Sequence, residues 1–368
     1  MRFALRELRR RPGRFATATV ILTLIAILLM FLGSLLDGLI RSSTGAIRAQ
    51  DGDVLVYSDA SRASLARSLI DPGVRAEIES VPGVVDTGGV GLVQLGARVP
   101  GAGERDLAAV ALFGVEIPPA GVPEVPPPGQ VYADEVLRSD GIAIGTELLL
   151  GPARSPVEVI GFVTDTSFIG QGALWSDAAT WREVLEQNRP GARVGDEVFQ
   201  ALLVRGDTDA DGLAASIDTA TGSTESLSIT DAANALPGVE EQQGTFNQII
   251  GVTLVIAVVV IGLFFALITV ERTALYGVLK ALGARTSTLF AGLVAQAAVV
   301  TLIAAVIAAG ALIALDAAIP PGGLPLDVTP ERIIVSTVLL LIAAIAGCAF
   351  SLRRILKIDP ASAIGSGS

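Results

Sequence analysis

The stretch that decides the fold is residues 15–36, FATATVILTLIAILLMFLGSLL, which contains no charged side chain. A helix needs about 20 apolar residues to cross the hydrocarbon core of a bilayer. Three further uncharged blocks follow, at 248–270, 286–315 and 333–352. Buried helices of soluble proteins are usually shorter and carry polar residues along one face. The sequence therefore predicts an α-helical membrane protein with four transmembrane helices, the first over residues 15–40.

The first block differs from a cleaved secretory signal. A signal peptide has an apolar region of at most about 15 residues, followed by small residues at a cleavage site. Here the apolar run is longer and leads into Leu35-Leu36-Asp37-Gly38-Leu39-Ile40, which offers no such site. We therefore expect an uncleaved first helix.

The composition excludes several classes of function. Of the 368 residues 51% are hydrophobic and 17% are charged, whereas a soluble domain carries about 25% charged residues. The net charge of −11 argues against nucleic acid as a partner, because a nucleic-acid-binding protein needs a basic face. The sequence has no His, and its one Cys, Cys348, cannot form an internal disulfide. We expect no metal site and no cofactor in this chain.

The motif for nucleotide hydrolysis is also missing from the sequence. A Walker A loop requires a Gly-Lys dipeptide, and none occurs here. Any ATP that drives this protein must therefore be hydrolysed by another polypeptide.

Charges are divided unevenly along the chain, and this division predicts its orientation. Residues 1–14, 271–285 and 353–368 together contain 12 basic and 3 acidic residues. The remainder contains 14 basic and 34 acidic residues, so the net charge divides into +9 and −20. Lys and Arg close to the ends of spans stay in the cytoplasm. We expect both termini to be cytoplasmic, with 41–247 outside and 316–332 as a short outer loop.

The segment 41–247 has the length of an ordinary domain and mixes two kinds of pattern. Runs typical of strands lie at 53–57, 107–115, 157–163 and 198–204. Runs typical of helices lie at 63–70, 75–80 and 177–186, with Asp177 placed to cap the last. The proline-rich stretch 117–129 is expected to be a loop. Strands interleaved with short helices predict a large extracytoplasmic α+β domain between the first two spans.

Two pairs of adjacent acids are the candidates for acid–base chemistry in this domain. They are Asp134-Glu135 and Asp196-Glu197. A carboxylate pair can act as acid and base when burial raises one pKa. Solvated acids at a helix start or in a loop are the simpler interpretation. We favour it, and we predict no catalytic residue.

The loop between the second and third spans reads ERTALYGVLKALGAR over residues 271–285. Apolar residues recur in it at helical spacing: Leu275, Val278, Leu279 and Leu282. Gly283 can end such a helix in a left-handed conformation. The pattern is compatible with a plain interfacial turn or with an amphipathic helix on which a cytosolic partner docks.

This loop resembles the FtsX-like permeases of ABC transporters, the MacB type (type VII). The similarity is carried by Glu271-Arg272 and Val278-Leu279-Lys280-Ala281-Leu282-Gly283-Ala284. It extends to LRRRPGRF at 8–15, similar to the family's amphipathic N-terminal helix, and to LRRILKIDPA at 352–361. The order of one span, a large outer domain and three more spans is also similar. Within the family the chain most resembles the branch of heme exporters and DevC-like exporters, and it lacks the fused ATPase domain of MacB.

The resemblance implies a permease subunit without enzymatic activity in a bacterial cell membrane. It implies a homodimer of permeases with two copies of a cytosolic ABC ATPase, which holds ATP and Mg. ATP binding brings the ATPases together, and the helices transmit that motion to the outer domains, a process called mechanotransmission. The implied coupling residues, within the helix at 271–285, are Glu271, Arg272, Gly277, Leu279, Lys280 and Gly283.

The uncharged spans favour an amphipathic or hydrophobic substrate, such as heme, a lipid, a peptide or a drug. Charged side chains inside spans mark paths for ions and polar solutes, and the four blocks contain none. Met30, Phe31 and Phe246 are the candidate substrate contacts at the outer part of the spans, although Met30 also suits simple packing. If the cargo is heme, its iron needs a ligand other than His, and the choices are Met30, Tyr57, Tyr132, Glu240 and Glu241.

Two other functions remain open from the sequence, and a third has no support in it. Some relatives in the resembling family activate a cell-wall hydrolase and transport nothing, and others release lipoproteins from the membrane. An integral membrane enzyme would need clustered acidic, Ser or Lys side chains at membrane depth, and we find no such cluster in the spans.

Overall fold

The structure is a computed structural model, and it describes residues 12–101, 103, 106–192, 194–271, 278, 282, 285–319 and 323–356. The chain divides into two compact units. Unit 1 consists of Met1–Asp37, Gln242–Pro320 and Leu326–Ser368, and unit 2 consists of Gly38–Glu241 and Pro321–Pro325. The cytoplasmic segments predicted at 1–14 and 353–368 lie mostly outside the described residues.

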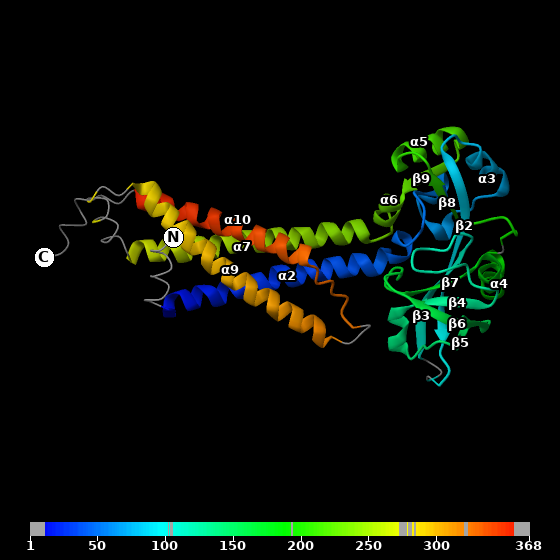
Figure 1. The fold of residues 1–368 in the computed structure, drawn as a ribbon, viewed down its shortest axis with the longest axis horizontal. Helices are drawn as coiled ribbons and strands as arrows, with labels where there is room; N and C mark the ends of the chain where they lie inside the picture. Colours follow the sequence, from blue (N-terminus) through cyan, green and yellow to red (C-terminus); the bar gives the residue numbers. More distant parts are fainter. Residues whose placement is uncertain are drawn as a thin grey trace. The chain divides into compact units, whose positions relative to one another are not determined.

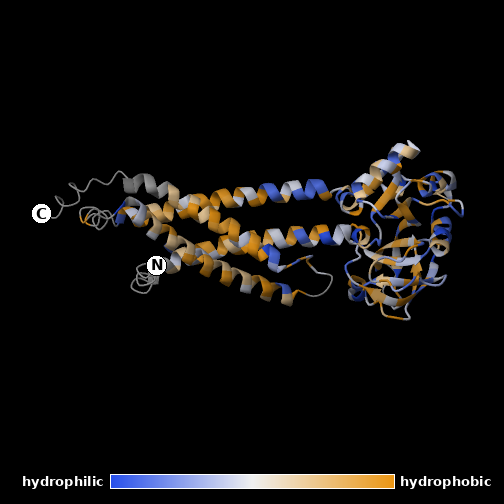
Figure 2. Cartoon of the chain, turned by 45° about the horizontal axis from the view of Figure 1, so that its top comes forward, coloured by the Kyte–Doolittle hydropathy of each residue, from blue (hydrophilic) through white to orange (hydrophobic). Residues whose placement is uncertain are grey.

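Unit 1 is built from four long helices (Figure 1). They are α2 (Pro12–Arg48), α7 (Val239–Glu271), α9 (Thr286–Ala318) and α10 (Pro330–Leu356). In the described part of the chain, these four are long and apolar enough to cross a membrane, which confirms the predicted number of spans. The apolar stretches run along the middle of the helices, and the last turns of α2 and the first turns of α7 are hydrophilic (Figure 2).

Two of these helices run well beyond their apolar blocks. Helix α2 continues to Arg48, although the first span was predicted to end at residue 40, and α7 already begins at Val239 instead of 248. Hydropathy marks only the part of a helix that lipid can surround. The polar residues of these extensions contain no Pro that would stop the helix, so it continues through them.

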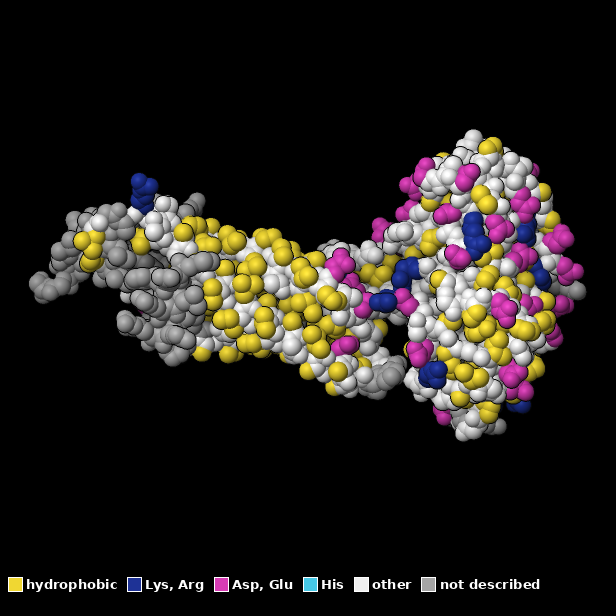
Figure 3. Space-filling view, in the orientation of Figure 1, with side chains coloured by type: hydrophobic (Ala, Val, Ile, Leu, Met, Phe, Trp, Pro, Cys, Tyr) yellow, Lys and Arg dark blue, Asp and Glu magenta, His cyan; other side chains and the backbone are white. Residues whose placement is uncertain are grey.

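The helices of unit 1 pack through small residues. A cluster of buried side chains includes Ala26, Ala297, Ala304 and Ala344. A Cβ atom on Gly347 of α10 would lie 2.8 Å from the carbonyl oxygen of Val258 on α7. Small residues let helix backbones approach closely in membranes, where van der Waals packing drives helix association. The outward faces are apolar as well, as the hydrophobic covering of this unit shows (Figure 3).

The strands of unit 2 form one nine-stranded sheet among the described residues, in the order β3-β7-β4-β6-β5-β2-β8-β1-β9. The strands are β1 (Val54–Ser58), β2 (Val84–Arg98), β3 (Leu107–Val115), β4 (Gln130–Asp134), β5 (Glu147–Leu150), β6 (Ser155–Val163), β7 (Gly172–Asp177), β8 (Ala201–Gly206) and β9 (Thr224–Ser228). The pairs β3–β7 and β4–β6 are parallel, and the other pairs are antiparallel. This mixed architecture confirms the predicted α+β class.

The long strand β2 links two parts of this sheet. Its first half, up to Val90, pairs with β8, and from Val90 to Arg98 it pairs with β3. Its last residues, Ala97 and Arg98, also pair with β5. The pairings therefore close a ring through β2, β3, β7, β4, β6 and β5, and the open sheet β2-β8-β1-β9 extends from it.

Helices cover both parts of the sheet. Helices α3 (Pro72–Glu79) and α5 (Ala210–Thr221) share a buried cluster with β1 and β8. Helix α4 (Ala178–Asn188) contacts β2 and β3, and α6 (Ile229–Asn234) follows β9. Asp177 caps α4 by accepting from the backbone of Ala179 and Thr180, as predicted. Four 3-10 turns among the described residues complete the unit: η1 (Asp59–Ser61), η2 (Leu65–Arg67), η3 (Glu135–Asp140) and η4 (Pro190–Ala192).

The helix predicted at 63–70 is wrong. Only the short turn η2 forms there, because Arg62 and Ala63 have positive φ angles of 52° and 53° and break the helical path. The segment ends with Ile70 in an isolated bridge to Phe199, where each backbone N–H donates to the other residue's carbonyl. A tertiary contact thus replaces the helix that the local pattern favours.

Candidate functional site: the membrane helices and the α2 junction

Most of the predicted coupling segment lies outside the described residues. This holds for Arg272, Gly277, Leu279, Lys280 and Gly283. Glu271 is the last residue of α7 and is exposed. Farther on, the backbone N–H of Leu282 donates to the carbonyl of Val278 at 3.0 Å, the i→i+4 spacing of a helical turn.

The three predicted substrate contacts have different surroundings. Met30 on α2 has no exposed surface and belongs to the buried cluster of unit 1. Phe31, the next residue, is half-buried and packs against the same cluster. Phe246 lies half-buried in the first part of α7. The structure therefore brings Met30 and Phe31 to one helix cluster, and a molecule that touches Met30 requires the helices to part.

A narrow apolar cleft lies between α2 and α7. It is lined by Ala18, Ile21, Leu22, Val260, Ile261, Phe264 and Phe265. The volume of the cleft is about 10 Å³, which corresponds to about one water molecule. No cargo fits this cleft in the present arrangement of the helices.

Asp37 within α2 and Arg332 at the start of α10 form a charged pair, and neither residue was predicted to belong to a site. Arg332 in the first turn of α10 donates through Nε and Nη2 to both carboxylate oxygens of Asp37 on α2. The side chains are only 26% (Asp37) and 23% (Arg332) exposed. Beside this pair the backbone N–H of Asp327 donates to the carbonyl of Ser34 at 3.0 Å. A bidentate Arg–carboxylate pair fixes geometry as well as charge, so it ties α2 to the start of α10.

In unit 2 the last turns of α2 are held by the loop before β7, and we call Arg41–Arg48 together with Asp165–Gly170 the α2 junction. Arg41 Nε and Arg48 Nη2 both donate to Asp165 Oδ1, at 2.8 and 2.9 Å. The backbone adds three bonds: Ala46 N–H to Ser167 O, Ile169 N–H to Ser43 O and Gly170 N–H to Ser42 O. A Cβ atom on Gly45 would lie 2.8 Å from the carbonyl oxygen of Asp165, so the loop lies directly on the helix backbone.

Asp134 holds this loop from the other side. Its Oδ2 atom accepts from the backbone N–H and from the hydroxyl of Thr166, each at 2.8 Å. Its Oδ1 atom caps η3 by accepting from Val136 N–H. Asp134 is only 3% exposed, so the expectation that it is solvated is wrong: both oxygens of its carboxylate accept hydrogen bonds from protein donors. Glu135, Asp196 and Glu197 are exposed.

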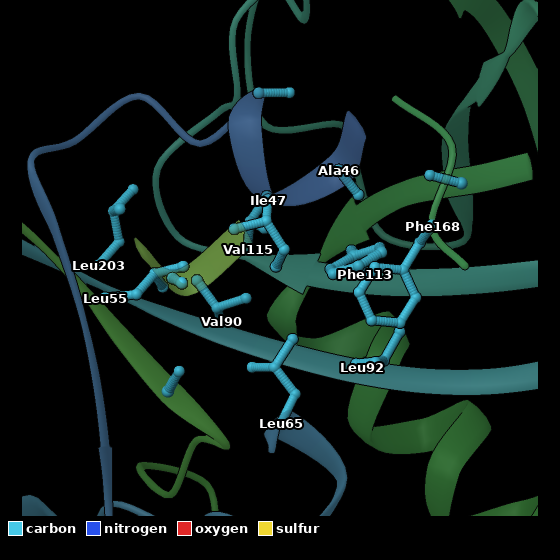
Figure 4. Packing of buried hydrophobic residues seen from close by; sticks show 14 of the residues in the cluster. Ala46, Ile47, Leu55, Leu65, Val90, Leu92, Phe113, Val115, Phe168 and Leu203 are labelled. Carbon is cyan, nitrogen blue, oxygen red and sulfur yellow. The ribbon is translucent and has the colours of Figure 1, made fainter. Parts of the chain in front are cut away.

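The junction also has an apolar side. Ala46 and Ile47 have no exposed surface and lie in one cluster with Val115, Phe113 and Phe168 (Figure 4). The Phe113 ring stacks on Trp175 with centroids 4.7 Å apart. The last turns of α2 are therefore part of the core of unit 2, and a displacement of these turns must move strands β3 and β7 with them.

The residues proposed as heme ligands are spread over different environments. Tyr57 has no exposed surface, and burial, with a smaller contribution from Glu225, raises its pKa above the ordinary value. Tyr132 is half-buried on β4, and Glu240 and Glu241 are exposed in the first turn of α7. Within the described residues no three His, Cys, Asp or Glu side chains gather at a possible metal site.

Comparisons with known proteins point to one class of membrane protein. Residues 247–360 match the family of FtsX-like permease C-terminal domains. A Staphylococcus epidermidis protein named HrtB, for a hemin transport system permease, is 23% identical over 368 residues, which is the full length of both chains. A second HrtB, of Staphylococcus haemolyticus, is 25% identical over 126 residues, 34% of this chain and 36% of its own.

Two solved structures resemble part of the chain. The periplasmic region of MacB from Actinobacillus actinomycetemcomitans is 11% identical, with a TM-score of 0.35, and the match covers 52% of this chain and 95% of that one. The extracellular domain of the noncanonic ABC-type transporter YknZ from Gram-positive bacteria is 14% identical, with a TM-score of 0.32. This match covers 48% of this chain and 99% of that one.

Proposed function

We propose, from the premise that this chain is an ABC transporter permease of the FtsX-like type, that it extrudes an amphipathic molecule from a bacterial membrane. The energy comes from a separate cytosolic ATPase, present in two copies, which binds ATP and Mg. The permease itself forms a homodimer within the lipid bilayer, and both of its termini lie in the cytoplasm.

The observation that carries this proposal is the uncharged character of the four spans. Between 15 and 36, 248 and 270, 286 and 315, and 333 and 352 the sequence has no ionisable side chain except Cys348. A polar solute would need such groups along its path. Apolar side chains instead face outward on the helices, among them Leu24, Val259 and Leu263. These features support a cargo that moves along the lipid-facing surface of the helices.

The α2 junction supports mechanotransmission as the means of extrusion. The helix that carries Met30 and Phe31 continues without a break into the core of unit 2. We infer that ATP-driven movement of the helices reaches the outer domain through the Arg41–Arg48 segment and displaces the cargo there. The coupling contact with the ATPase is assigned to Glu271, Arg272, Gly277, Leu279, Lys280 and Gly283.

A hemin-like molecule is the cargo that the comparisons favour, because the full-length relative is named as a hemin permease. Hemin joins a large apolar ring to two carboxylates and so has the amphipathic chemistry that the spans suit. Activation of a cell-wall hydrolase and release of lipoproteins are the competing functions, and both predict no loss of hemin from the cell.

The test is protection of a hemin-sensitive bacterium. Cells that express this chain with its ATPase should grow at hemin concentrations that arrest cells expressing either subunit alone, and their cell-associated hemin should fall. An ATPase with its Walker A lysine replaced serves as the control and should give no protection. Equal cell-associated hemin in all strains, together with altered wall hydrolysis, would favour the signalling function instead.

A further inference from the structure

We infer that unit 2 contains a binding site for the acidic end of an amphipathic molecule, in a cavity between η2, β2 and the end of α4. We call it the α4–β2 cavity. Its volume is about 230 Å³, slightly below the range of about 300–1,000 Å³ that is typical of pockets that enclose a whole ligand. The cavity therefore suits one end of a larger molecule.

The wall of the cavity is amphipathic. Leu92 of β2 and Leu185 of α4 form its buried apolar part. Leu69 at the rim is 55% exposed, which leaves an apolar edge where the remainder of a ligand can lie. Ligand sites commonly combine such apolar walls with a few polar groups that fix orientation.

Two arginines from different elements line the same cavity. Arg67 ends η2, and Arg189 is the C-cap residue of α4. Arg189 Nη2 donates to the carbonyl oxygen of Gln94 at 3.1 Å, which places its guanidinium at the wall. Neither arginine forms an ion pair with an acidic side chain in the described part of the chain, although the sequence as a whole has 37 acidic and 26 basic residues. Two uncompensated guanidinium groups at one cavity favour an anion.

The amide side chain of Gln200 adds a hydrogen-bond donor to the lining of the cavity. Gln200 is only 8% exposed, and its Oε1 atom accepts from the backbone N–H of Leu92. This bond fixes the Oε1 end of the side chain, and in the described part of the chain no residue accepts a hydrogen bond from its Nε2 group. An amide NH2 group that makes no bond within the protein can donate to a ligand or a water molecule in the cavity. A carboxylate between Arg67 and Arg189 would supply that acceptor.

The chemistry of the site therefore specifies an organic anion with an apolar body, bound through its carboxylate. The choice of a cargo-like ligand rests on the proposed function, since a hemin-like molecule carries carboxylates on one edge. The existence of the site does not rest on the proposed function, because it depends only on the cavity and its two arginines. In the cell it would hold extruded cargo at the outer domain.

The test uses the full chain in nanodiscs of zwitterionic lipid, with protoporphyrin IX as a fluorescent, metal-free probe and empty nanodiscs as the background. We expect saturable binding that weakens about tenfold in Arg67→Gln and in Arg189→Gln, because each loses a charged hydrogen bond. Arg62→Gln is the matched control, an exposed arginine of the same segment that does not line the cavity. Arg67→Lys and Arg189→Lys should keep part of the affinity that the Gln variants lose. The dimethyl ester of the probe should bind to wild type no more tightly than to the Gln variants.

The outcomes separate this inference from the proposed function. Equal affinity of wild type, Arg67→Gln, Arg189→Gln and Arg62→Gln would overturn the site, even if cells still extrude hemin. Arginine-dependent binding in a protein that gives no ATP-dependent hemin loss would support the site and reject the export function. Binding of the ester at the affinity of the free acid would also overturn the site, because it would show an apolar cavity without anion recognition.

Discussion

The ion pair between Asp37 and Arg332 fixes the contact between two helices of unit 1. Each lies at the end of an uncharged block, and the bidentate contact joins helices that are almost 300 positions apart in sequence. Replacing Asp37 by Asn leaves a half-buried guanidinium with a weaker acceptor. Removing one partner of a charged hydrogen bond costs about 1.5–3 kcal/mol.

We therefore expect Asp37→Asn and Arg332→Gln each to lower the unfolding temperature in detergent. In a double-mutant cycle the second substitution should cost little once the first is present, because the two residues act as one contact. Fully additive effects would contradict a direct pair.

Gly45 gives a second test at a single position. A methyl group there would meet the backbone of Asp165 and Ser167 within 2.9 Å, and backbone cannot move aside as a flexible side chain can. Gly45→Ala should therefore destabilise the α2 junction, by about 1–3 kcal/mol as for other overpacked sites. The matched control is Gly244→Ala on α7, where nothing lies within 4 Å.

Because Ala is the better helix former, the control should be neutral or stabilise by about 0.5–1 kcal/mol. Proteolysis of the outer domain reports the difference: Gly45→Ala should be cut faster than wild type, and Gly244→Ala should not. Equal resistance of both variants would contradict the tight contact at the junction.

Single residues also mark the limit of what the sequence predicts. Asp134 was expected to be solvated, yet its carboxylate is buried by donors from Thr166, which lies more than 30 positions away. Met30 fits both packing and a substrate contact by its chemistry, and the structure finds it fully buried. Which partner reaches a side chain depends on long-range contacts that no local pattern encodes.

Whole elements are predicted more reliably where one physical pattern dominates. The four spans follow from length and the absence of charge, and β3 follows from its apolar run at 107–115. The predicted strand runs do not include β2, in which Gly88, Gly89 and Gly91 weaken the strand pattern. The structure explains them: the rings of Phe199 and Trp181 lie where Cβ atoms of Gly89 and Gly91 would be.

Helices α7 and α10 supply a prediction about helix packing. Gly347 of α10 lies against the backbone of Val258 and Gly262, so Gly347→Leu must force the two helices apart. Gly310→Leu on α9, where the space is open, is the matched control. Membrane extracts should show Gly347→Leu aggregated or degraded at a temperature where Gly310→Leu remains monodisperse by size-exclusion chromatography. Identical elution of both variants would contradict the close crossing.

The coupling segment after α7 gives a prediction about the partner. If the 271–285 helix docks the ATPase, Lys280→Glu should lose hemin protection and co-purification of the ATPase, while the level of the permease in the membrane stays normal. Arg62→Gln in unit 2 should keep both. A Lys280→Glu variant that retains protection would remove the coupling role from this segment.

At the scale of the whole molecule, the division of charge predicts the orientation of the chain in the membrane. The +9 of the predicted cytoplasmic segments and the −20 of the remainder sum to the −11 of the complete chain, and only the separate values bear on orientation. The closure of the ring of strands through β2 could not be predicted from local sequence patterns. It depends on long-range pairings of β2 with β3, β5 and β8.

Orientation is tested by labelling single cysteines in a Cys348→Ala background. A Cys at Asp207, an exposed position in unit 2, should react with a membrane-impermeant maleimide in intact cells. A Cys at Val278, exposed beyond α7, should react only after lysis. The reverse pattern would overturn the topology.

In the proposed function, a separate ATPase drives the extrusion of an amphipathic cargo. The most direct measurement is the ATPase rate and the hemin content of proteoliposomes that contain the purified permease with its ATPase. We predict that hemin in the bilayer raises the ATPase rate and that ATP lowers bilayer hemin, with both effects lost when the Walker A lysine is replaced. An ATPase rate indifferent to hemin, with bilayer hemin unchanged by ATP, would contradict the account.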